Sequence, residues 1–498
     1  MRIRKIAAAA VAAVMFFSIC MTGRRPVRAD SPITAREAVD EIGVGWNLGN
    51  TLDSYGTWIT GTDPASFETA WGNPETTKAM IDSVKAHGFN AIRIPVTWAQ
   101  HIDAEGNVDR AWMDRVKTVV DYAMENDLYV ILNVHHDTGE HGGDKVCWIM
   151  ADGTSFGQAE ARYRKLWGQI ATEFKDYGYK LMFEGYNEVL DINNTWNAPS
   201  TSDALDTVNK MAQAFVDSVR ATGGNNADRN LIVNTYVSSV DQRVLDAFVL
   251  PSDTVQDHLI AEVHVYAPWS FTGTAASVTW TSVHSDWTGD DSNEVANIMN
   301  SLDAFSKRLG VPVIIGECGA EFKENDTARC DYAKCLVSQA ASRGIKCFWW
   351  DNGDYKTSGE GGYAIFNRAA GTWNEGIVSA LTGSAVSKPV ERAGTLTPPS
   401  PTPTQVPGTE PSEPSSTPDE TTVVTSQEET EVAETETSET AETKAGREDG
   451  PGQKAGDDNE EKSGWSSGRI AAVVISGIVI VAAAYAGLFL LGLSRRKK

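Results

Sequence analysis

Two patterns of hydrophobic and polar positions alternate along the chain between about residue 30 and residue 388. Short apolar runs, typical of strands buried on both faces, alternate with longer stretches of helical periodicity. The pattern predicts eight strands: Gly43–Asn47, Ala91–Ile94, Tyr129–Asn133, Lys180–Phe183, Leu231–Asn234, Ile260–His264, Val313–Gly316 and Cys347–Trp350. Predicted helices separate most of them, at Glu75–His87, Asp109–Asn126, Phe156–Tyr177, Ser202–Thr222, Asn293–Leu309 and Thr327–Arg343.

This alternation places the chain in the α/β class. Strands separated by helices form a parallel sheet, and eight such units favour closure into a (β/α)8 TIM barrel. An open doubly wound sheet is the alternative, but no Gly-x-Gly-x-x-Gly motif follows the first strand to support nucleotide binding. The barrel also predicts where a site forms, because active sites of this fold lie at the carboxyl ends of the strands.

The N-terminal segment, residues 1–29, has the features of a secretory signal peptide. Basic residues at positions 2, 4 and 5 precede the apolar run Ile6–Met21, and Val27–Ala29 forms a small-x-small cleavage site. Residues 30–388 form the predicted barrel domain. We therefore expect the body of the protein to be secreted.

The C-terminal segment predicts a membrane anchor. Ile470–Leu493 is a run of 24 residues without a charge, long enough to cross about 30 Å of hydrocarbon as a helix. The basic residues 495–498 follow it and are expected to stay in the cytoplasm. We assign 469–494 to a transmembrane helix, so that the barrel lies on the extracellular face of a bacterial cell, which we expect to be Gram-positive.

A linker at 389–468 joins the barrel to this anchor. It is rich in Pro and Thr at first and in Glu and Thr further on, a composition typical of a disordered spacer. From 394 to 467 it carries 17 acidic and 4 basic residues, a net charge of −13 out of −24 for the whole chain. Because most of the acidity lies in the linker and no basic stripe is present, nucleic acid is not an expected partner. We expect a monomer.

Cysteine usage excludes a disulfide framework. Five of the six cysteines lie after the signal peptide: Cys147, Cys318, Cys330, Cys335 and Cys347. An odd, sparse set in a large secreted domain leaves room for one bridge, which the spacing does not assign. No Cys-x-x-Cys or clustered Cys/His spacing indicates structural zinc.

Polar residues follow the predicted strands where a barrel site forms. In chain order they are Arg93, His135, His136, Asn187, Glu188, His264, Tyr266, Glu317 and Trp350. Two carboxylates at the ends of different strands can face each other across a barrel mouth, as glycoside hydrolysis requires. Glu188 is then the acid/base and Glu317 the nucleophile, kept ionised by Arg93 and Tyr266. Trp350 offers a ring face for a sugar.

The motifs around these residues resemble glycoside hydrolase family 5, and the opening Gly45–Asp53 is similar to its clostridial endoglucanases. The matching segments, in the order of the family, are Gly45–Asn50, Arg93–Val96, Asn133–His136, Phe183–Glu188, His264–Tyr266, Ile315–Glu317 and Phe348–Asp351. The resemblance implies a retaining endo-β-1,4-glucanase without cofactor or metal, acting on a β-glucan. It makes Glu188 the acid/base and Glu317 the nucleophile. Asn50, Arg93, His135, His136, Asn187, His264, Tyr266 and Trp350 are the candidate substrate-binding residues.

Several alternatives stay open at this point. Mannanase, xyloglucanase and lichenase activities occur in the same family, and a non-catalytic carbohydrate-binding barrel is a further candidate. His135, His136, Asp137 and His141 together could suggest a metal site, which the hydrolysis does not require. Trp46 either lines a sugar subsite or plugs the barrel, Glu184 supports its neighbours, and Cys318 is either a nucleophile or a small buried residue.

Overall fold

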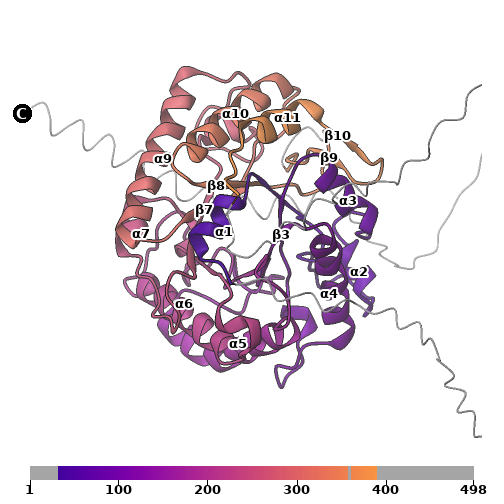
Figure 1. The fold of residues 1–498 in the computed structure, drawn as a ribbon, viewed down its shortest axis with the longest axis vertical. Helices are drawn as coiled ribbons and strands as arrows, with labels where there is room; N and C mark the ends of the chain where they lie inside the picture. The colour runs from indigo at the N-terminus through magenta and orange to yellow at the C-terminus, as the bar shows by residue number, and fades with distance from the viewer. Residues whose placement is uncertain (1–31, 357–360, 390–498) are drawn as a thin grey trace, which may run out of the picture. The chain divides into compact units, whose positions relative to one another are not determined.

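The computed structural model describes residues 32–356 and 361–389. Eight parallel strands close into a barrel in chain order, and β1 pairs with β8 (Figure 1). The strands are β1 Gly45–Asn47, β2 Ala91–Ile94, β3 Tyr129–Asn133, β4 Leu181–Glu184, β5 Leu231–Asn234, β6 Leu259–Val265, β7 Val313–Cys318 and β8 Lys346–Trp349. All eight predicted strands are present, so the closed barrel is confirmed and the open sheet is wrong.

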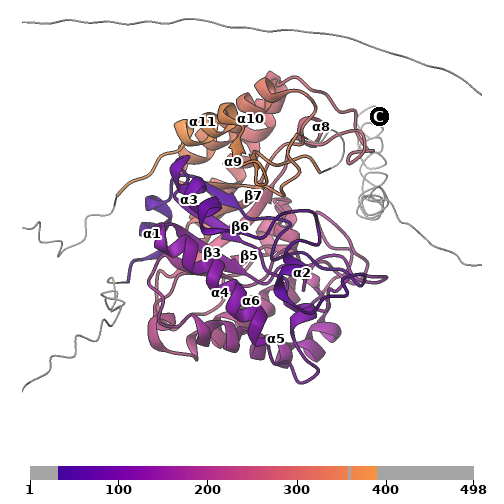
Figure 2. The same cartoon turned by 90° about the vertical axis from the view of Figure 1, so that its right-hand side faces the viewer.

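Helices surround the barrel in the described part of the chain. They are α1 Ala35–Glu41, α2 Pro64–Glu68, α3 Lys78–Ala86, α4 Arg110–Glu125, α5 Gly153–Glu173, α6 Ala204–Arg220, α7 Gln242–Ala247, α8 Trp269–Thr272, α9 Gly289–Leu309, α10 Asp326–Ala341 and α11 Glu375–Ser384. Short 3₁₀ turns lie at Ala99–His101, Gly224–Ala227 and Tyr236–Ser238, and β9 Phe366–Asn367 pairs with β10 Thr372–Trp373. Five of these described helices were not predicted: α1, α2, α7 between β5 and β6, α8, and α11 beside α10 (Figure 1, Figure 2).

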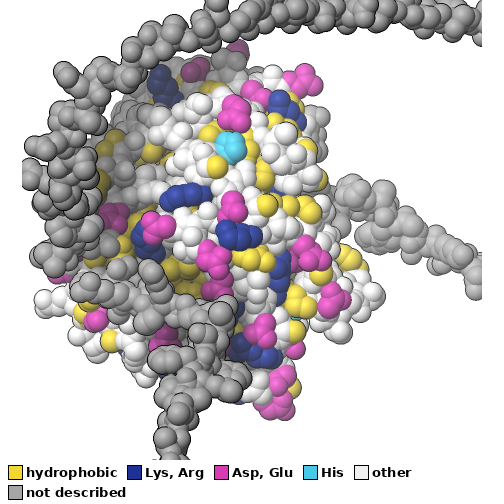
Figure 3. Space-filling view, turned by 45° about the vertical axis from the view of Figure 1, so that its right-hand side comes forward, with side chains coloured by type: hydrophobic (Ala, Val, Ile, Leu, Met, Phe, Trp, Pro, Cys, Tyr) yellow, Lys and Arg dark blue, Asp and Glu magenta, His cyan; other side chains and the backbone are white. Residues whose placement is uncertain are grey.

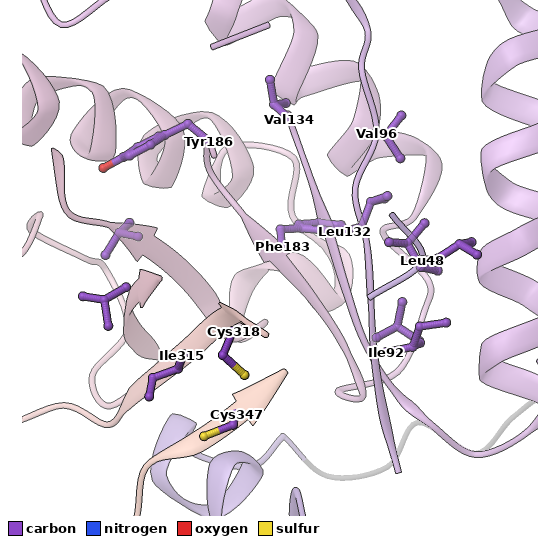
Figure 4. Close-up of a cluster of buried hydrophobic side chains, with 14 of the residues drawn as sticks. Leu48, Ile92, Val96, Leu132, Val134, Phe183, Tyr186, Ile315, Cys318 and Cys347 are labelled. Carbon is purple, nitrogen blue, oxygen red and sulfur yellow. The ribbon is translucent and has the colours of Figure 1, made fainter. Parts of the chain in front are cut away.

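The core has two parts, because successive residues of a strand point to opposite sides of the barrel wall. Outward residues pack against the surrounding helices. Figure 4 shows examples such as Ile92, Leu132, Phe183 and Ile315. The inward residues at the N-terminal ends of the strands form an apolar floor, which α1 covers from below: Ala91, Tyr129, Ile131, Met182, Ile232, Ile260, Ile314 and Phe348.

Polar residues occupy the next inward positions along the strands. Above the floor the inward side chains are Asn47, Arg93, Asn133, Glu184, Asn234 and Glu262, and all of them are fully buried. Burial of charged groups is costly unless they are paired, so we expect most members of this layer to form a network of hydrogen bonds and ion pairs. The network lies directly beneath the carboxyl ends of the strands, where the candidate catalytic residues emerge.

A bulge in β7 changes the direction of Glu317. The pairing with β6 shifts register between Val263–Ile315 and His264–Glu317, so that Gly316 is an extra residue in β7. Without this insertion, regular alternation from the inward Ile314 would turn Glu317 toward the helices. A β-bulge re-aims the side chains that follow it. Here it lets Gly316 and Glu317 both face the barrel interior.

Gly45 allows the close approach of β8 to β1 at the barrel floor. A Cβ atom on Gly45 would lie 2.0 Å from the ring of Phe348. We expect Gly45→Ala to lower the free energy of unfolding by about 1–3 kcal/mol, as overpacking of a core does. Gly157 of α5 has no neighbour within 4 Å of such a Cβ. Gly157→Ala should therefore raise the free energy of unfolding by about 0.5–1 kcal/mol through helix propensity. Urea denaturation of both variants checks the pair, and equal stabilities would contradict the packing argument.

The predicted signal peptide, linker and membrane helix lie outside the described residues, apart from the first residue of the linker. Within the described ranges, no helix is long and apolar enough to cross a membrane. The five cysteines there are all free. On the face drawn in Figure 3, the visible Lys and Arg side chains are interspersed with Asp and Glu and form no continuous basic stripe.

Candidate active site

Arg93 is the centre of the buried polar network. It lies inside the barrel on β2 with no exposed surface. Its Nε and Nη2 donate to the two carboxylate oxygens of Glu184 at 2.6 and 2.7 Å, and Nη2 also donates to Asn187 Oδ1 at 2.8 Å. Its Nη1 donates to Glu317 Oε1 at 2.7 Å and to Asn47 Oδ1 at 3.1 Å. The planar guanidinium thus fixes the orientation of four side chains from three other parts of the barrel.

Glu317 has the surroundings of an ionised carboxylate. Arg93 donates to its Oε1, and the Tyr266 hydroxyl donates to its Oε2 at 2.8 Å. Burial acts to raise the pKa of Glu317, but the charges of His264 and Arg93 and these two hydrogen bonds outweigh it, so the pKa lies below its usual value. A buried carboxylate that stays charged and has an open face is suited to nucleophilic attack.

Glu188 follows β4 and has the opposite electrostatic environment. Its Oε1 lies 2.8 Å from Nδ1 of His264. Burial raises the pKa of Glu188, and the negative charge of Glu317 adds to this, whereas the hydrogen bond and charge of His264 oppose it. The net pKa is above the usual range, as a general acid requires.

The two carboxyl groups lie close together. An oxygen of Glu188, an oxygen of Glu317 and a nitrogen of His264 are all within 4.8 Å of one another. Burial acts against a charged His264, but the surrounding carboxylates raise its pKa to about 10. An inverting pair, which needs room for a water molecule, stands about 6.5–9.5 Å apart, whereas a retaining pair stands about 5–5.5 Å apart. The spacing therefore fits a nucleophile and an acid rather than an inverting pair.

The remaining candidate residues form one side of the barrel mouth. His135 lies parallel to the ring of Trp350, with ring centres 5.9 Å apart and planes 8° apart. Gly49 makes room for this tryptophan, because a Cβ there would lie 2.8 Å from the indole ring. His136 packs edge-on against Tyr55 at 5.1 Å, and burial lowers its pKa to about 3. His135 and His136 thus contribute an uncharged, partly aromatic surface.

Asn50 and Asn187 differ in how firmly they are held. The amide of Asn187 accepts from Arg93, which leaves its NH₂ group free to donate outward. Asn50 has a left-handed backbone with φ of 54°, and its N–H donates to Asp53 Oδ2. The buried Asp53 therefore fixes the loop in which Asn50 lies, and the Asn50 side chain has no hydrogen-bond partner among the described residues.

The sequence prediction of the site did not include three residues of this polar layer, Asn47, Asn133 and Glu262. Asn47 on β1 bonds both Arg93 and the carbonyl of Gly316, and Asn133 on β3 donates to Glu184. Asn47 and Asn133 lie at the carboxyl ends of their predicted strands, and the network residue Glu262 lies two positions before His264. A search for polar residues on the same strand face as Arg93 and His264 would have found all three.

The structure also decides the open alternatives at this end of the barrel. Trp46 points outward and packs against the stacked rings of Phe366 and Trp373, so it neither lines a subsite nor plugs the barrel. Cys318 points outward too, and burial raises the pKa of its thiol well above the usual value, which excludes a reactive thiolate. Glu184 is fully buried and bonded to Arg93, as expected for a supporting residue.

His135, His136, Asp137 and His141 do not converge on one point. The carboxylate of Asp137 accepts from Trp98 N and Trp148 Nε1, and His141 Nε2 faces the carbonyl of Ile192. Asp53, not Asp137, lies close to the two neighbouring histidines. The Asn133 NH₂ group faces His135 Nδ1 at 3.1 Å, so Nδ1 accepts and Nε2 carries the ring proton. This tautomer donates outward from Nε2 rather than binding a metal there.

A (β/α)8 barrel with two close carboxyl groups of opposite pKa shift at its mouth has the arrangement of an O-glycoside hydrolase. The profile of one such family, cellulase (glycosyl hydrolase family 5), matches residues 52–356. The chain belongs to glycosyl hydrolase family 5.

Relatives of known activity and structure agree with this assignment. Endoglucanase A of Clostridium longisporum is 40% identical over 369 residues, which cover 72% of this chain and 68% of that protein. A broad-specificity endoglucanase from Ruminococcus champanellensis with bound cellotriose is 40% identical with a TM-score of 0.65, over 70% of this chain and 99% of that one. A Prevotella bryantii family 5 enzyme in complex with a xyloglucan tetradecasaccharide is 41% identical with a TM-score of 0.63, over 71% and 99%.

Proposed function

We propose that the protein hydrolyses internal bonds of a β-glucan with retention of configuration, using Glu317 as nucleophile and Glu188 as acid/base. The observation that carries this proposal is the contrast between the two carboxyl groups. Glu317 is bonded to Arg93 and Tyr266 and has a lowered pKa, whereas Glu188 has a raised pKa and an oxygen within 4.8 Å of Glu317.

In the first step, Glu317 attacks the anomeric carbon and forms an ester bond to it. The bond from that carbon to the leaving glycosidic oxygen breaks, and Glu188 transfers its proton to this oxygen. Arg93 and Tyr266 hold the attacking carboxylate in position while positive charge develops on the sugar ring. The Asn187 NH₂ group, oriented by Arg93, is placed to donate a hydrogen bond to a sugar hydroxyl.

In the second step, the roles of Glu188 reverse. The ester has removed the negative charge of Glu317, so the neighbouring charge that raised the pKa of Glu188 is gone. Glu188, now ionised, accepts a proton from water, and the water oxygen attacks the anomeric carbon. The ester bond breaks, Glu317 becomes a carboxylate again, and the product keeps its configuration.

The opposite pKa shifts predict a bell-shaped pH dependence of kcat/KM. Activity falls at low pH, where Glu317 becomes protonated, and the pKa of this group lies below the usual value for a glutamate. Activity also falls at high pH, where Glu188 becomes ionised, and the pKa of this group lies above the usual value. We expect the wild-type enzyme to show this alkaline limb on cellotetraose and to lack it on 2,4-dinitrophenyl β-cellobioside, whose phenolate leaves without a proton. An equal alkaline limb on both substrates would assign it to another group.

The substrate is a β-1,4-glucan, and the chain is an endo-β-1,4-glucanase. Relatives described as endoglucanases, a lichenase and a xyloglucan-specific endo-β-1,4-glucanase support this assignment. Reducing-sugar release from carboxymethyl cellulose, mixed-linkage glucan, xyloglucan and glucomannan, assayed in parallel with the full-length protein, identifies the preferred backbone. Activity on glucomannan alone would replace the glucanase by a mannanase, and no activity on any of the four would favour a binding protein.

We also propose that the enzyme is extracellular and held at the cell surface by Ile470–Leu493. The uncharged length of this segment, the basic residues 495–498 after it and the signal-like residues 1–29 support this. The full-length protein should sediment with membranes, and a chain that ends at residue 468 should appear in the culture medium. Full-length protein found only in the medium would contradict the anchor.

A further inference from the structure

Glu262 is a buried carboxyl group that the mechanism above does not use. It lies on β6 inside the barrel, two residues before His264, and it has no exposed surface. Among the described residues, neither of its carboxylate oxygens has a hydrogen-bond partner. The groups that face it are His264 Nε2 at 3.4 Å and Arg93 Nε at 3.6 Å, both from Oε1.

The neighbouring strand leaves space for this carboxyl group. A Cβ atom on Gly316 of β7 would lie 1.5 Å from Glu262 Oε1, so no other residue fits at position 316 without moving Glu262. Gly316 is also the extra residue of the β7 bulge that turns Glu317 inward. The same glycine therefore turns the nucleophile inward and leaves space for the buried carboxyl group. This shared dependence on Gly316 makes Glu262 part of the same site as Glu317.

A single proton would bond one oxygen of Glu262 to the ring of His264. His264 Nε2 is buried and, like Glu262, has no hydrogen-bond partner in the described chain. An ionised, unbonded carboxylate in such a place is costly, and burial together with the charge of Glu184 raises the pKa of Glu262 to about 7 despite His264 and Arg93. A proton between Oε1 and Nε2, held by either atom, forms one hydrogen bond after a small side-chain rotation.

Both placements of this proton leave a proton on the other ring nitrogen. If Glu262 holds it and donates to Nε2, the neutral ring carries its own proton on Nδ1. If Nε2 holds it, the ring is cationic and Nδ1 is protonated as well. In each case Nδ1–H donates to Glu188 Oε1, 2.8 Å away. Because Oε1 accepts this bond, the acidic proton of Glu188 lies on Oε2.

We propose that Glu262 is a positioning residue for the proton-transfer step: it occupies Nε2 of His264, so that Nδ1–H always donates to Glu188 Oε1 and the acidic proton stays on Oε2. The inference rests on the proposed role of Glu188 as acid. Glu262 is one of the carboxylates that keep the His264 ring charged, so without it the ring can be neutral and hold its single proton on Nε2. Its Nδ1 then accepts the proton of Glu188, which turns that proton away from the leaving oxygen.

Leaving-group dependence separates this role from a purely structural one. A glucose leaving group needs the proton of the acid, whereas 2,4-dinitrophenolate does not. We expect Glu262→Met to lose about 10–100-fold in kcat/KM on cellotetraose, a part of the usual contribution of general acid catalysis, and less than about 3-fold on 2,4-dinitrophenyl β-cellobioside. Glu262→Gln, whose NH₂ group can donate to Nε2, should restore most of the loss on cellotetraose.

Two further variants distinguish the failure of this inference from the failure of the proposed function. Glu188→Gln should lose activity selectively on cellotetraose, and Glu317→Gln on both substrates. If Glu188→Gln loses both equally, the acid assignment is wrong. If Glu188→Gln is selective but Glu262→Met loses both substrates equally, or neither, the role of Glu262 is wrong.

A measurement on the unaltered protein covers the case in which Glu262→Met does not fold. In ¹⁵N spectra of histidine-labelled enzyme, with His264 assigned by its substitution, Nδ1 of His264 should carry a proton from about pH 5 to about pH 8, the range in which imidazoles ordinarily change charge. An unprotonated Nδ1 anywhere in this range overturns the proposal.

Discussion

Glu317→Gln is expected to abolish hydrolysis of every glucan while the barrel stays folded. The amide cannot form the ester to the anomeric carbon, so the double displacement has no first step. Removal of the nucleophile in covalent hydrolases lowers kcat by as much as about 10⁶-fold, and we expect a loss on the order of 10⁵-fold here. Initial rates on carboxymethyl cellulose and on 2,4-dinitrophenyl β-cellobioside should fall together, because the loss does not depend on the leaving group.

Stability shows whether the loss is chemical. The glutamine can still accept from Arg93 or Tyr266, so the midpoint of thermal unfolding should shift by only a few degrees. Asn209→Ala serves as the active control. It removes an amide of α6 that bonds the backbone of Ala247 and Val249 and takes no part in the buried network around Arg93. If Glu317→Gln kept more than about a tenth of the activity, the nucleophile would have to be another group.

Arg93→Met is expected to have the second-largest effect, on stability as well as on activity. The substitution removes the cation from the buried carboxylates of Glu184 and Glu317. Breaking a buried ion pair by removing one partner costs about 3–5 kcal/mol, because the other charge is left without compensation. Urea denaturation at neutral pH should show a loss of this size, and kcat/KM should fall as Glu317 loses its orientation.

The pH dependence of this loss identifies its cause. Without the guanidinium, the folded-state pKa of Glu317 rises, because burial is then opposed by fewer favourable contacts. The folded variant therefore binds more protons than the folded wild type, so its stability falls relative to wild type as the pH rises through this range. The gap between wild type and Arg93→Met should widen from about pH 4 to about pH 7, where unperturbed carboxyl groups become ionised.

Arg229 provides the matched control for Arg93. It is also a buried arginine, but it donates only to carbonyl oxygens, among them those of Phe174 and Leu181, and to Asn226. Arg229→Met should lose stability by an amount that does not change with pH over the same range, and kcat/KM should stay near wild type. A pH-independent gap in Arg93→Met would show that lost packing, not an unpaired charge, is responsible.

The strands of the barrel were predictable because a strand that is buried on both faces is apolar at consecutive positions of the sequence. Runs such as residues 130–132 are apolar without alternation, and each is followed by a polar residue where the strand leaves the barrel. The prediction of the helices was less complete. The helix α7 has six residues, too few to show a period, and α11 contains two glycines and two serines, which lower its helical signal.

The two catalytic candidates were predictable from their position at strand ends, although Asn47 and Asn133, which also end strands, were missed. Glu188 and Glu317 stand where a barrel places its active site, so their position and type were informative together. Glu262 lies in the middle of an apolar strand, and its sequence neighbours do not reveal that it faces Arg93 and His264 across the barrel. The β7 bulge has no sequence signal beyond Gly316, yet it decides that Glu317 faces inward.

The central claim is that Glu317 becomes covalently bonded to the sugar, and a slow substrate tests it most directly. Incubation with 2-deoxy-2-fluoro-β-cellobiosyl fluoride should inactivate the enzyme with one fluorocellobiosyl group per molecule. Its fluoride leaves without a proton, whereas the fluorine at carbon 2 slows release of the ester. Digestion and mass spectrometry should find the group on Glu317. Label on Glu188 or another residue, or turnover of a glucan to product of inverted configuration without any label, would contradict the account.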